Sequence, residues 1–494
     1  MNKVEVLAAV TFGARIAENE IDTLKSYFVE TEQWRKVISG QVDVVYGPKG
    51  SGKSALYALL RNSEDDLVER RIVLAPGENV RGTPVFEALV GDPPAGEEEF
   101  RALWKLYFLS LIGTASRMVK LSGDAATELN DRLDEAGLLQ PEFSLKRSLQ
   151  AALDYVRRIE SLSAGVKIDP NSGIPSGLEG KITIREPGIE GRKRGFISAD
   201  SLLEIANKAL DENTLKFWIA LDRLDVAFAD SAALEENALR ALFRVSRDIA
   251  ALENIKLKIF LRDDIWARIT TQGFREASHV TESITITWEQ KSLLNLVIRR
   301  LLHNEPVRQF YRVDAAKVLS SSSEQEKLFY RVFPKQIDAG KRKSTTLDWI
   351  LTRTADGAGK TAPRELIHLL SVARDEQLKL LEMGAPEPPG QALFDRAAFK
   401  AALPEVSKVR FQQTLCAEYS KLKPALIKLD GEKTQQSAGT LAKIWRVKEA
   451  EALATAEQLT EIGFFQKRGP KDQPLFWVPF LYRDALHLVQ GQAE

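Results

Sequence analysis

The sequence has few of the residues that build metal and thiol sites. It contains one cysteine, Cys416, and four widely separated histidines in 494 residues. A single cysteine excludes an internal disulfide, and the histidine spacing matches no Cys/His zinc motif. These shortages argue against a metal hydrolase and against a thiol enzyme.

The chain also lacks an excess of one charge and any long apolar run. Lysine plus arginine total 69, as do aspartate plus glutamate, so any contact with a polyanion has to be local. No apolar run approaches the ~20 residues of a membrane span. The first 17 residues include Lys3, Glu5 and Arg15, unlike the apolar region of a signal peptide. We therefore expect a cytoplasmic protein with no membrane partner.

Length and composition indicate a folded protein of several domains. Hydrophobic residues make up 44% of the chain and charged residues 28%, which is ordinary for globular proteins. At about 150 residues per domain, the chain is long enough for roughly three domains.

Short β-rich runs, the last of which alternates isoleucine and threonine, predict the strands of an α/β sheet. They lie at residues 42–46, 71–74, 217–221, 257–261 and 284–288. Longer helical segments separate them, which favours a mostly parallel sheet with helical crossovers. Residues 14–39 show helical spacing, so we expect a helix leading into the first strand.

An insertion is expected between the second and third strands. Residues 84–161 look helical, and they carry an apolar stripe that we interpret as core: Phe100, Leu103, Trp104, Tyr107 and Phe108. Frequent glycines from Gly165 to Gly195 predict a loop or β-hairpin. That segment includes Arg192-Lys193-Arg194, either a polyanion contact or a solvated loop tip.

The C-terminal half begins as a helical region and ends in a segment with strand candidates. Residues 289–403 look helical, with a polar gap at 341–344. Later helices are followed by two short strand candidates, 461–466 and 475–478, around a turn at Gly469-Pro470. Two strands around a turn after helices predict a winged helix.

A complete phosphate-binding motif follows the first strand. Its residues, G-x-x-x-x-G-K-[ST] in pattern, are Gly47, Pro48, Lys49, Gly50, Ser51, Gly52, Lys53 and Ser54. A strand precedes it and a helical run follows, as this motif requires. Backbone N–H groups of such a loop face phosphate oxygens, the lysine reaches the β- and γ-phosphates, and the serine hydroxyl ligates Mg²⁺. We therefore expect ATP and Mg²⁺ as ligands.

A second glycine-rich fragment only partly matches this motif. Gly357-Ala358-Gly359-Lys360-Thr361 has Thr354 where the first glycine belongs, and no strand precedes it. We expect it to end one helix and start the next, with Pro363 in the first turn of the new helix.

The third strand candidate ends in an acidic residue. Asp222 follows four apolar residues, the arrangement expected for a carboxylate that holds Mg²⁺ from a second side. The alternative is a surface aspartate that ends a strand. Arg223 follows where many hydrolysing ATPases have glutamate, so Asp225 is the candidate for positioning water. Hydrolysis is therefore expected to be slow or conditional.

The chain resembles a family of bacterial P-loop ATPases that is similar to the KAP and STAND NTPases of the wider AAA+ class. The resemblance is carried by the phosphate loop, by Asp222-Arg223-Leu224-Asp225 and by Thr361-Ala362-Pro363-Arg364-Glu365-Leu366. It spans most of the chain, from about Phe12 to Arg483. Typical KAP proteins have a membrane-spanning insertion, which this sequence lacks.

The resemblance implies two arginines that sense the γ-phosphate. Arg262 ends the strand after Asp222, and Arg364 starts a helix of the helical domain. A guanidinium can bind phosphate oxygens through two N–H groups. The alternatives are surface ion pairs of Arg262 with Asp263 or Asp264, and of Arg364 with Glu365.

Together these features predict three domains. Residues 1–290 form a P-loop NTPase domain with an insertion at about 84–200, residues 291–403 a helical lid, and residues 404–494 a winged-helix-like domain. The wing carries Lys467, Arg468 and Lys471, which suit contact with DNA phosphates. By resemblance, such a domain more often packs on the nucleotide domain and regulates it.

Three functions remain open at this stage. The first is an ATP-dependent conformational switch that acts as a homo-oligomer or on an effector protein; such relatives often serve bacterial stress or anti-phage defence. The second is a DNA-associated ATPase, and the third is an adaptor that keeps nucleotide only to fold.

Overall fold

The computed structural model describes residues 1–15, 19–77, 96–141, 147–155, 198–224, 232–271, 274, 280–470 and 472–493. These form two compact units. Unit 1 comprises Met1–Thr31, Pro48–Gly52 and Thr287–Glu494, and unit 2 comprises Glu32–Gly47 and Lys53–Ile286. Asp225, Arg192-Lys193-Arg194, Lys471 and the glycine-rich segment 165–195 lie outside the described residues.

Unit 2 contains a five-stranded parallel sheet in the order β2-β3-β4-β1-β5. The strands are β1 (Val44–Gly47), β2 (Ile72–Gly77), β3 (Lys216–Leu221), β4 (Ile255–Arg262) and β5 (Ser283–Thr285). Every residue of β1 and nearly every residue of β3 is buried, as a parallel sheet covered on both faces requires. The predicted α/β fold is confirmed, and β4 lies between the strands that carry the phosphate loop and Asp222.

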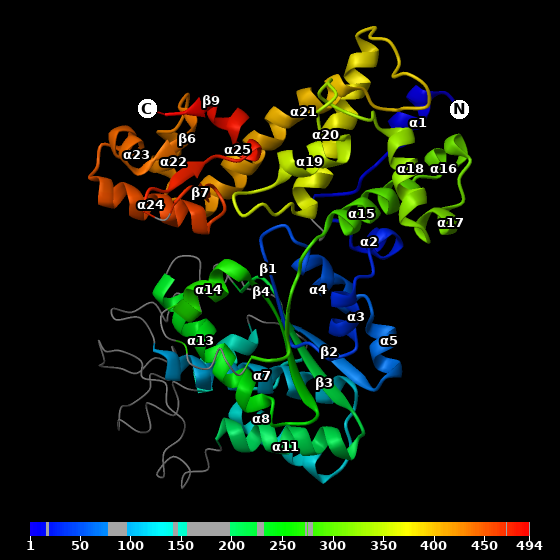
Figure 1. Ribbon diagram of the computed structural model, residues 1–494. Helices are drawn as coiled ribbons and strands as arrows, with labels where there is room; N and C mark the ends of the chain where they lie inside the picture. The colour runs from blue at the N-terminus through cyan, green and yellow to red at the C-terminus, as the bar shows by residue number, and fades with distance from the viewer. Residues whose placement is uncertain are drawn as a thin grey trace. The chain divides into compact units, whose positions relative to one another are not determined.

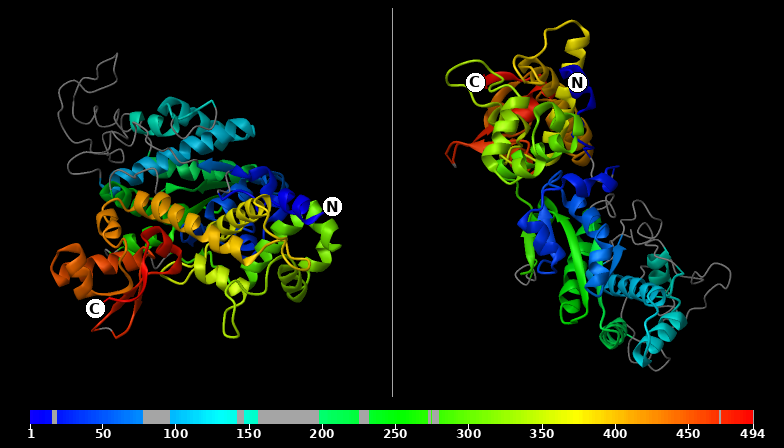
Figure 2. Two further views of the ribbon diagram at one scale, coloured as in Figure 1. Left: turned by 90° about the horizontal axis from the view of Figure 1, so that it is seen from above. Right: turned by 90° about the vertical axis from the view of Figure 1, so that its right-hand side faces the viewer.

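Helices cover both faces of this sheet, with α3 and α4 on one side and α7 and α8 on the other (Figures 1 and 2). The helices of unit 2 are α3 (Glu32–Ile38), α4 (Lys53–Arg61), α5 (Glu64–Glu69), α7 (Glu97–Met118), α8 (Asp124–Ala136), α11 (Ala199–Glu212), α13 (Ala232–Ile249) and α14 (Asp263–Thr271). The aromatic stripe of α7 is buried as predicted, with the rings of Trp104 and Phe108 stacked.

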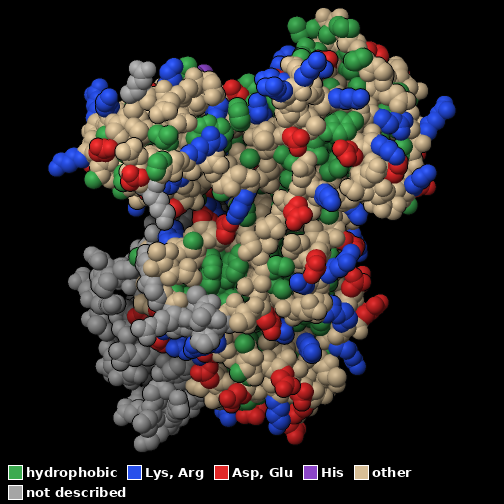
Figure 3. Space-filling model, viewed as in Figure 1, with side chains coloured by type: hydrophobic (Ala, Val, Ile, Leu, Met, Phe, Trp, Pro, Cys, Tyr) green, Lys and Arg blue, Asp and Glu red, His purple; other side chains and the backbone are tan. Residues whose placement is uncertain are grey.

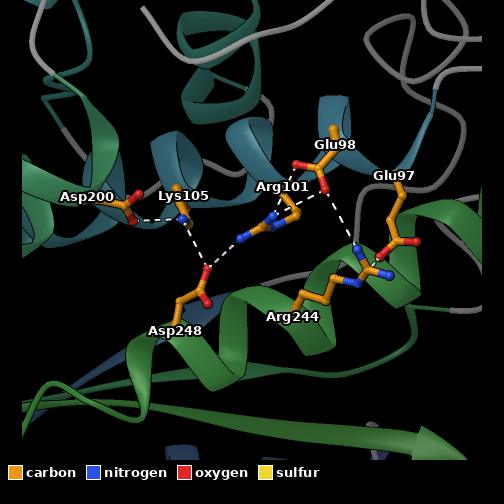
Figure 4. Close-up of polar contacts among 7 residues, drawn as sticks. All are labelled: Glu97, Glu98, Arg101, Lys105, Asp200, Arg244 and Asp248. Atoms are coloured by element: carbon orange, nitrogen blue, oxygen red, sulfur yellow. Dashed lines mark hydrogen bonds and ion pairs between the residues drawn. The ribbon is translucent and has the colours of Figure 1, made fainter. Parts of the chain in front are cut away.

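An ion-pair network joins three of these helices (Figure 4). Lys105 of α7 lies 2.6 Å from Asp200 of α11 and 3.1 Å from Asp248 of α13. Asp248 also accepts a 3.0 Å hydrogen bond from Arg101. Burial favours the neutral carboxyl, but the hydrogen bonds from Lys105 and Arg101 outweigh it and lower the pKa of Asp248. The network therefore joins α7 to α11 and α13.

Unit 1 has a helical region followed by a small mixed sheet. Its helices are α1 (Lys3–Ala9), α2 (Ile21–Tyr27), α15 (Gln290–His303), α16 (Glu305–Tyr311), α17 (Ala315–Leu319), α18 (Ser322–Val332), α19 (Thr346–Thr354), α20 (Pro363–Glu382), α21 (Arg396–Val409), the π-helix η3 (Arg410–Cys416), α22 (Lys423–Ile427), α23 (Ala438–Trp445), α24 (Glu449–Glu461), α25 (Phe480–Arg483) and the 3₁₀ turn η4 (Asp484–Leu486). The sheet, β7-β8-β6-β9, contains β6 (Lys433–Ser437), β7 (Gln466–Arg468), β8 (Leu475–Trp477) and β9 (Val489–Gln492). The antiparallel β7–β8 pair after α24 confirms the predicted winged helix.

The N-terminal segment belongs to unit 1 and is fixed there by buried polar contacts. Arg300 of α15 pairs with Glu20 at 2.7 Å, and both side chains are only 6% exposed. The guanidinium also donates to the carbonyl of Phe12 and lies 4.5 Å above the ring of Tyr27. The carboxylate, carbonyl and ring together compensate the buried cation.

Two sequence expectations about element boundaries need correction. The region 14–39 is not one helix: α2 ends where Phe28 is extended, which lets Val29 enter the core of unit 1, and α3 begins at Glu32. The fifth strand ends at Thr285 and does not reach Trp288 as expected. Trp288 belongs to unit 1, where its indole N–H donates to the carbonyl of Ser51 at 2.7 Å.

The described surface carries mixed charge. On the face shown in Figure 3, acidic and basic side chains are interspersed over both units. Among the described helices, none is long and apolar enough to cross a membrane.

Candidate functional site

The phosphate loop leaves the carboxyl end of β1 and enters α4 at Lys53, the strand–loop–helix context that the motif requires. Gly50 and Gly52 have φ values of +81° and +101°, which favour glycine. Lys53 donates to the carbonyl of Gly47 at 2.7 Å, so its ammonium group is held over the start of the loop.

The hydroxyl of Ser51 is an uncommon feature of this loop. The side chain is 1% exposed, and its Oγ makes no hydrogen bond with any described residue. Buried polar atoms nearly always have a partner, and a bound phosphate would supply one. The loop therefore fits a nucleotide through its glycine conformations, its lysine and this hydroxyl.

Asp222 lies on the same edge of the sheet as the loop. It follows Leu221, which is in register with Ile259 of β4, and Ile259 is in register with Val44 of β1. With neighbouring strands about 4.8 Å apart, β3 lies about 10 Å from β1. Asp222 and Ser54, which lies at the start of α4, are therefore both at the carboxyl end of the sheet.

The residue after this aspartate has an uncommon backbone conformation. Asp222 is 6% exposed, and Arg223 has φ +55°, an uncommon conformation for a residue other than glycine. Backbone strain of this kind concentrates at functional sites. Ser54 and Asp222 are the residues that would hold Mg²⁺, an ion that takes one or two protein oxygens together with phosphates and water.

Arg262 ends β4 directly beside the loop. Its Cα pairs in register with Gly47, and its guanidinium makes two hydrogen bonds to Asp264, at 2.9 and 2.7 Å. The structure thus contains the ion pair that is the alternative to a sensor role.

Arg364 is in the first turn of α20, and in unit 1 that turn lies against Gly50. A Cβ atom placed on Gly50 would be 3.1 Å from the Cβ of Arg364 and 3.4 Å from that of Ala362. Pro363 starts the helix as expected. Arg364 is therefore brought to the loop by contacts within unit 1, whereas Asp222 and Arg262 are placed by the sheet of unit 2.

The second glycine-rich fragment is structural, as the sequence analysis predicts. It connects α19 to α20, and Asp356 Oδ1 accepts hydrogen bonds from the backbone of Ala358 and Lys360, each at 3.0 Å. The N–H of Gly357 donates to the carbonyl of Gly463 at 2.7 Å. A glycine is needed because a Cβ here would be 2.9 Å from that carbonyl oxygen.

Several contacts at the loop and beside it were not found from the sequence. Lys49 forms an ion pair with Glu418, Trp288 donates to Ser51, and Glu365 accepts a 2.9 Å hydrogen bond from Arg410. These partners are far apart in sequence and belong to no shared motif, so spacing alone gave no signal.

Among known proteins, several solved structures are similar to the chain at low sequence identity. No protein-family model and no curated protein matches the chain. Similar solved structures include the Aeropyrum pernix ORC1 protein in complex with DNA, at 13% identity over 98% of this chain and 97% of that chain, with a TM-score of 0.35. They also include the Aeropyrum pernix ORC2 protein in ADPNP–ADP complexes, at 13% identity over 96% and 94%, with a TM-score of 0.39.

Proposed function

We propose that the protein is an ATP-binding P-loop ATPase whose nucleotide state sets the arrangement of its lid and winged-helix domains. The observation that carries this proposal is the complete phosphate loop between β1 and α4, with Asp222 on the same sheet edge. In this account Lys53 neutralises the phosphates, and Ser54 and Asp222 hold Mg²⁺. The three domains at 1–290, 291–403 and 404–494 remain part of the proposal.

Arg262 and Arg364 are the proposed sensors of the γ-phosphate, and Asp225 the proposed group that positions water. A ligand shifts a conformational equilibrium only if it binds one state better, so ATP and ADP have to be distinguished by contacts of this kind. The output is either assembly into a homo-oligomer or contact with an effector protein.

The test compares the protein without nucleotide, with ADP and with a non-hydrolysable ATP analogue. Particle mass and small-angle scattering report assembly and domain arrangement, and phosphate release from ATP reports turnover. The proposal predicts a change specific to the ATP analogue together with slow turnover. Identical mass and scattering in all three states would contradict the switch.

A DNA-associated ATPase is the second candidate, and the winged helix supplies the observation that favours it. The guanidinium of Arg468 lies 3.9 Å over the ring of Trp477, and Arg483 lies 4.6 Å from the same ring. Burial and the nearby Arg353 and Arg468 lower the pKa of Arg483 to about 10. Arg468 of β7 is exposed, whereas Arg483 of α25 is buried, so Arg468 is the side chain that a DNA phosphate would contact. This candidate extends to the present chain the DNA binding of the Aeropyrum pernix ORC1 complex.

Duplex DNA binding at increasing salt tests this candidate. Each phosphate contact contributes roughly 0.9 to the slope of log affinity against log salt, so Arg468→Gln should reduce that slope by about 1. Lys343→Gln, at an exposed lysine before α19, is the control and should leave the slope unchanged. Equal slopes for wild type and Arg468→Gln would count against the wing as the DNA contact.

A further inference from the structure

The phosphate loop is contacted by the C-terminal half of unit 1. Lys49 forms an ion pair with Glu418, and both side chains are partly buried, at 30% and 20% exposure. Next to it, a Cβ on Gly50 would lie 3.3 Å from Glu365 Oε2. Two acidic side chains therefore lie beside a loop whose motif binds phosphate.

Both acidic residues are connected to the π-helix η3. Glu418 comes two residues after its end, and Arg410, its first residue, lies 2.9 Å from Glu365 with both side chains largely buried. η3 also packs against α25 of the winged helix. A seven-residue π-helix is rare, and such irregularities often mark functional positions.

We propose that Glu418 is a built-in competitor of the nucleotide and that its ion pair with Lys49 couples the loop to η3. This inference rests on the proposed nucleotide binding. Without nucleotide, the Glu418 carboxylate pairs with the ammonium group of Lys49, and this ion pair restrains η3. A bound polyphosphate attracts Lys49 and repels the carboxylate, so the pair weakens and η3 is released. Because coupling is reciprocal, loss of the Glu418 charge strengthens nucleotide binding.

The test measures Mg-ADP and Mg-ATP affinity by calorimetry for wild type, Glu418→Gln and the control Glu405→Gln. Glu405 is exposed on α21, the helix that precedes η3. Glu418→Gln should tighten binding by about tenfold, within the ordinary range of allosteric coupling, and Glu405→Gln should bind like wild type. Wild-type affinity in Glu418→Gln would overturn the competitor role.

Amide hydrogen exchange provides a readout that does not depend on nucleotide. In nucleotide-free protein, Glu418→Gln should exchange faster than wild type across residues 410–418, and Glu405→Gln should not. Unchanged exchange would overturn the restraint on η3. If neither wild type nor Glu418→Gln binds nucleotide while exchange still rises, the proposed nucleotide function fails and the restraint on η3 stands.

Discussion

Arg262, the last residue of β4, lies in register beside Gly47, the first glycine of the phosphate loop, while Asp264 holds its guanidinium. A buried strand thus places a cation beside the first residue of the phosphate-binding motif, and a carboxylate pairs with that cation. To bind a γ-phosphate, the guanidinium of Arg262 would have to give up its hydrogen bonds to Asp264. This competition makes the proposed sensor testable from both partners.

We predict that Arg262→Ala lowers the preference for ATP over ADP by roughly tenfold, because a hydrogen bond to a charged group contributes about 1.5–3 kcal/mol. Asp264→Asn should raise the same preference, since the carboxylate no longer competes. Arg364→Ala should act like Arg262→Ala. The measurement is the ratio of ADP to ATP dissociation constants, and ratios equal to wild type in all three variants would refute the sensor roles.

Asp222→Asn should keep measurable nucleotide binding and abolish hydrolysis. The amide cannot supply the charge that places Mg²⁺ against the developing charge of the reaction. Phosphate release under saturating Mg-ATP is the measurement, and turnover at the wild-type rate would remove Asp222 from the site. Asp225→Asn, assayed alongside, tests whether Asp225 positions water: an unchanged rate would assign it no catalytic role.

His368 of α20 makes the stability of unit 1 depend on pH. Burial and the guanidinium of Arg15, 3.0 Å from its Nε2, lower the pKa of His368 to about 4 from 6.5. Protonation is therefore easier in the unfolded chain, and the folded state loses stability as pH falls from about 6.5 towards 4. The thermal midpoint of His368→Gln should fall less than that of wild type between pH 7 and pH 5. Equal decreases would contradict this role of His368.

Asp248→Asn should destabilise unit 2 by about 2 kcal/mol at pH 7, because it leaves the buried Lys105 with Asp200 alone. Because the pKa of Asp248 is lowered in the folded protein, its ion pairs stabilise unit 2 at pH values above 3.8, the ordinary pKa of the group. This stabilisation is lost as pH falls below that value. Burial lowers the pKa of Lys105, but its hydrogen bonds to Asp200 and Asp248 outweigh burial and raise it. The network therefore stabilises unit 2 until pH rises above 10.5.

Denaturant unfolding at pH 7 and at about pH 3 measures this effect. The exposed Asp134, 3.3 Å from Arg117, provides the control Asp134→Asn, which should cost under about 0.5 kcal/mol. The variant and wild type should converge in acid. A constant difference at both pH values would show that the charge of Asp248 is not the cause.

The sequence predicted the parts of the fold that follow from local pattern. Short β-rich runs identified all five strands: β1, β3 and β4 are largely buried, as expected where both faces of a parallel sheet are covered, and β5 was found from an alternating run. The loop motif and the aspartate after β3 are likewise local signals. The break between α2 and α3 was missed because it depends on where Val29 is buried, which no local periodicity records.

The contacts around the loop could not be predicted in the same way. The position of Arg262 beside Gly47 depends on β4 lying next to β1, a feature of topology. The ion pair of Lys49 with Glu418 joins the loop to a residue that follows the π-helix η3. The sequence of η3 contains no signal that predicts a π-helix. Tertiary packing decides both.

Calorimetric titration of Mg-ATP into wild type and Lys53→Ala tests the central claim most directly. Lys53 begins α4 and donates to the carbonyl of Gly47, so its removal should leave the phosphates without their main cationic partner. Circular dichroism and the thermal midpoint verify that the variant is folded. The account predicts saturable one-site binding to wild type and loss of most affinity in Lys53→Ala. Equal affinity in the folded variant, or no binding to wild type, would contradict it.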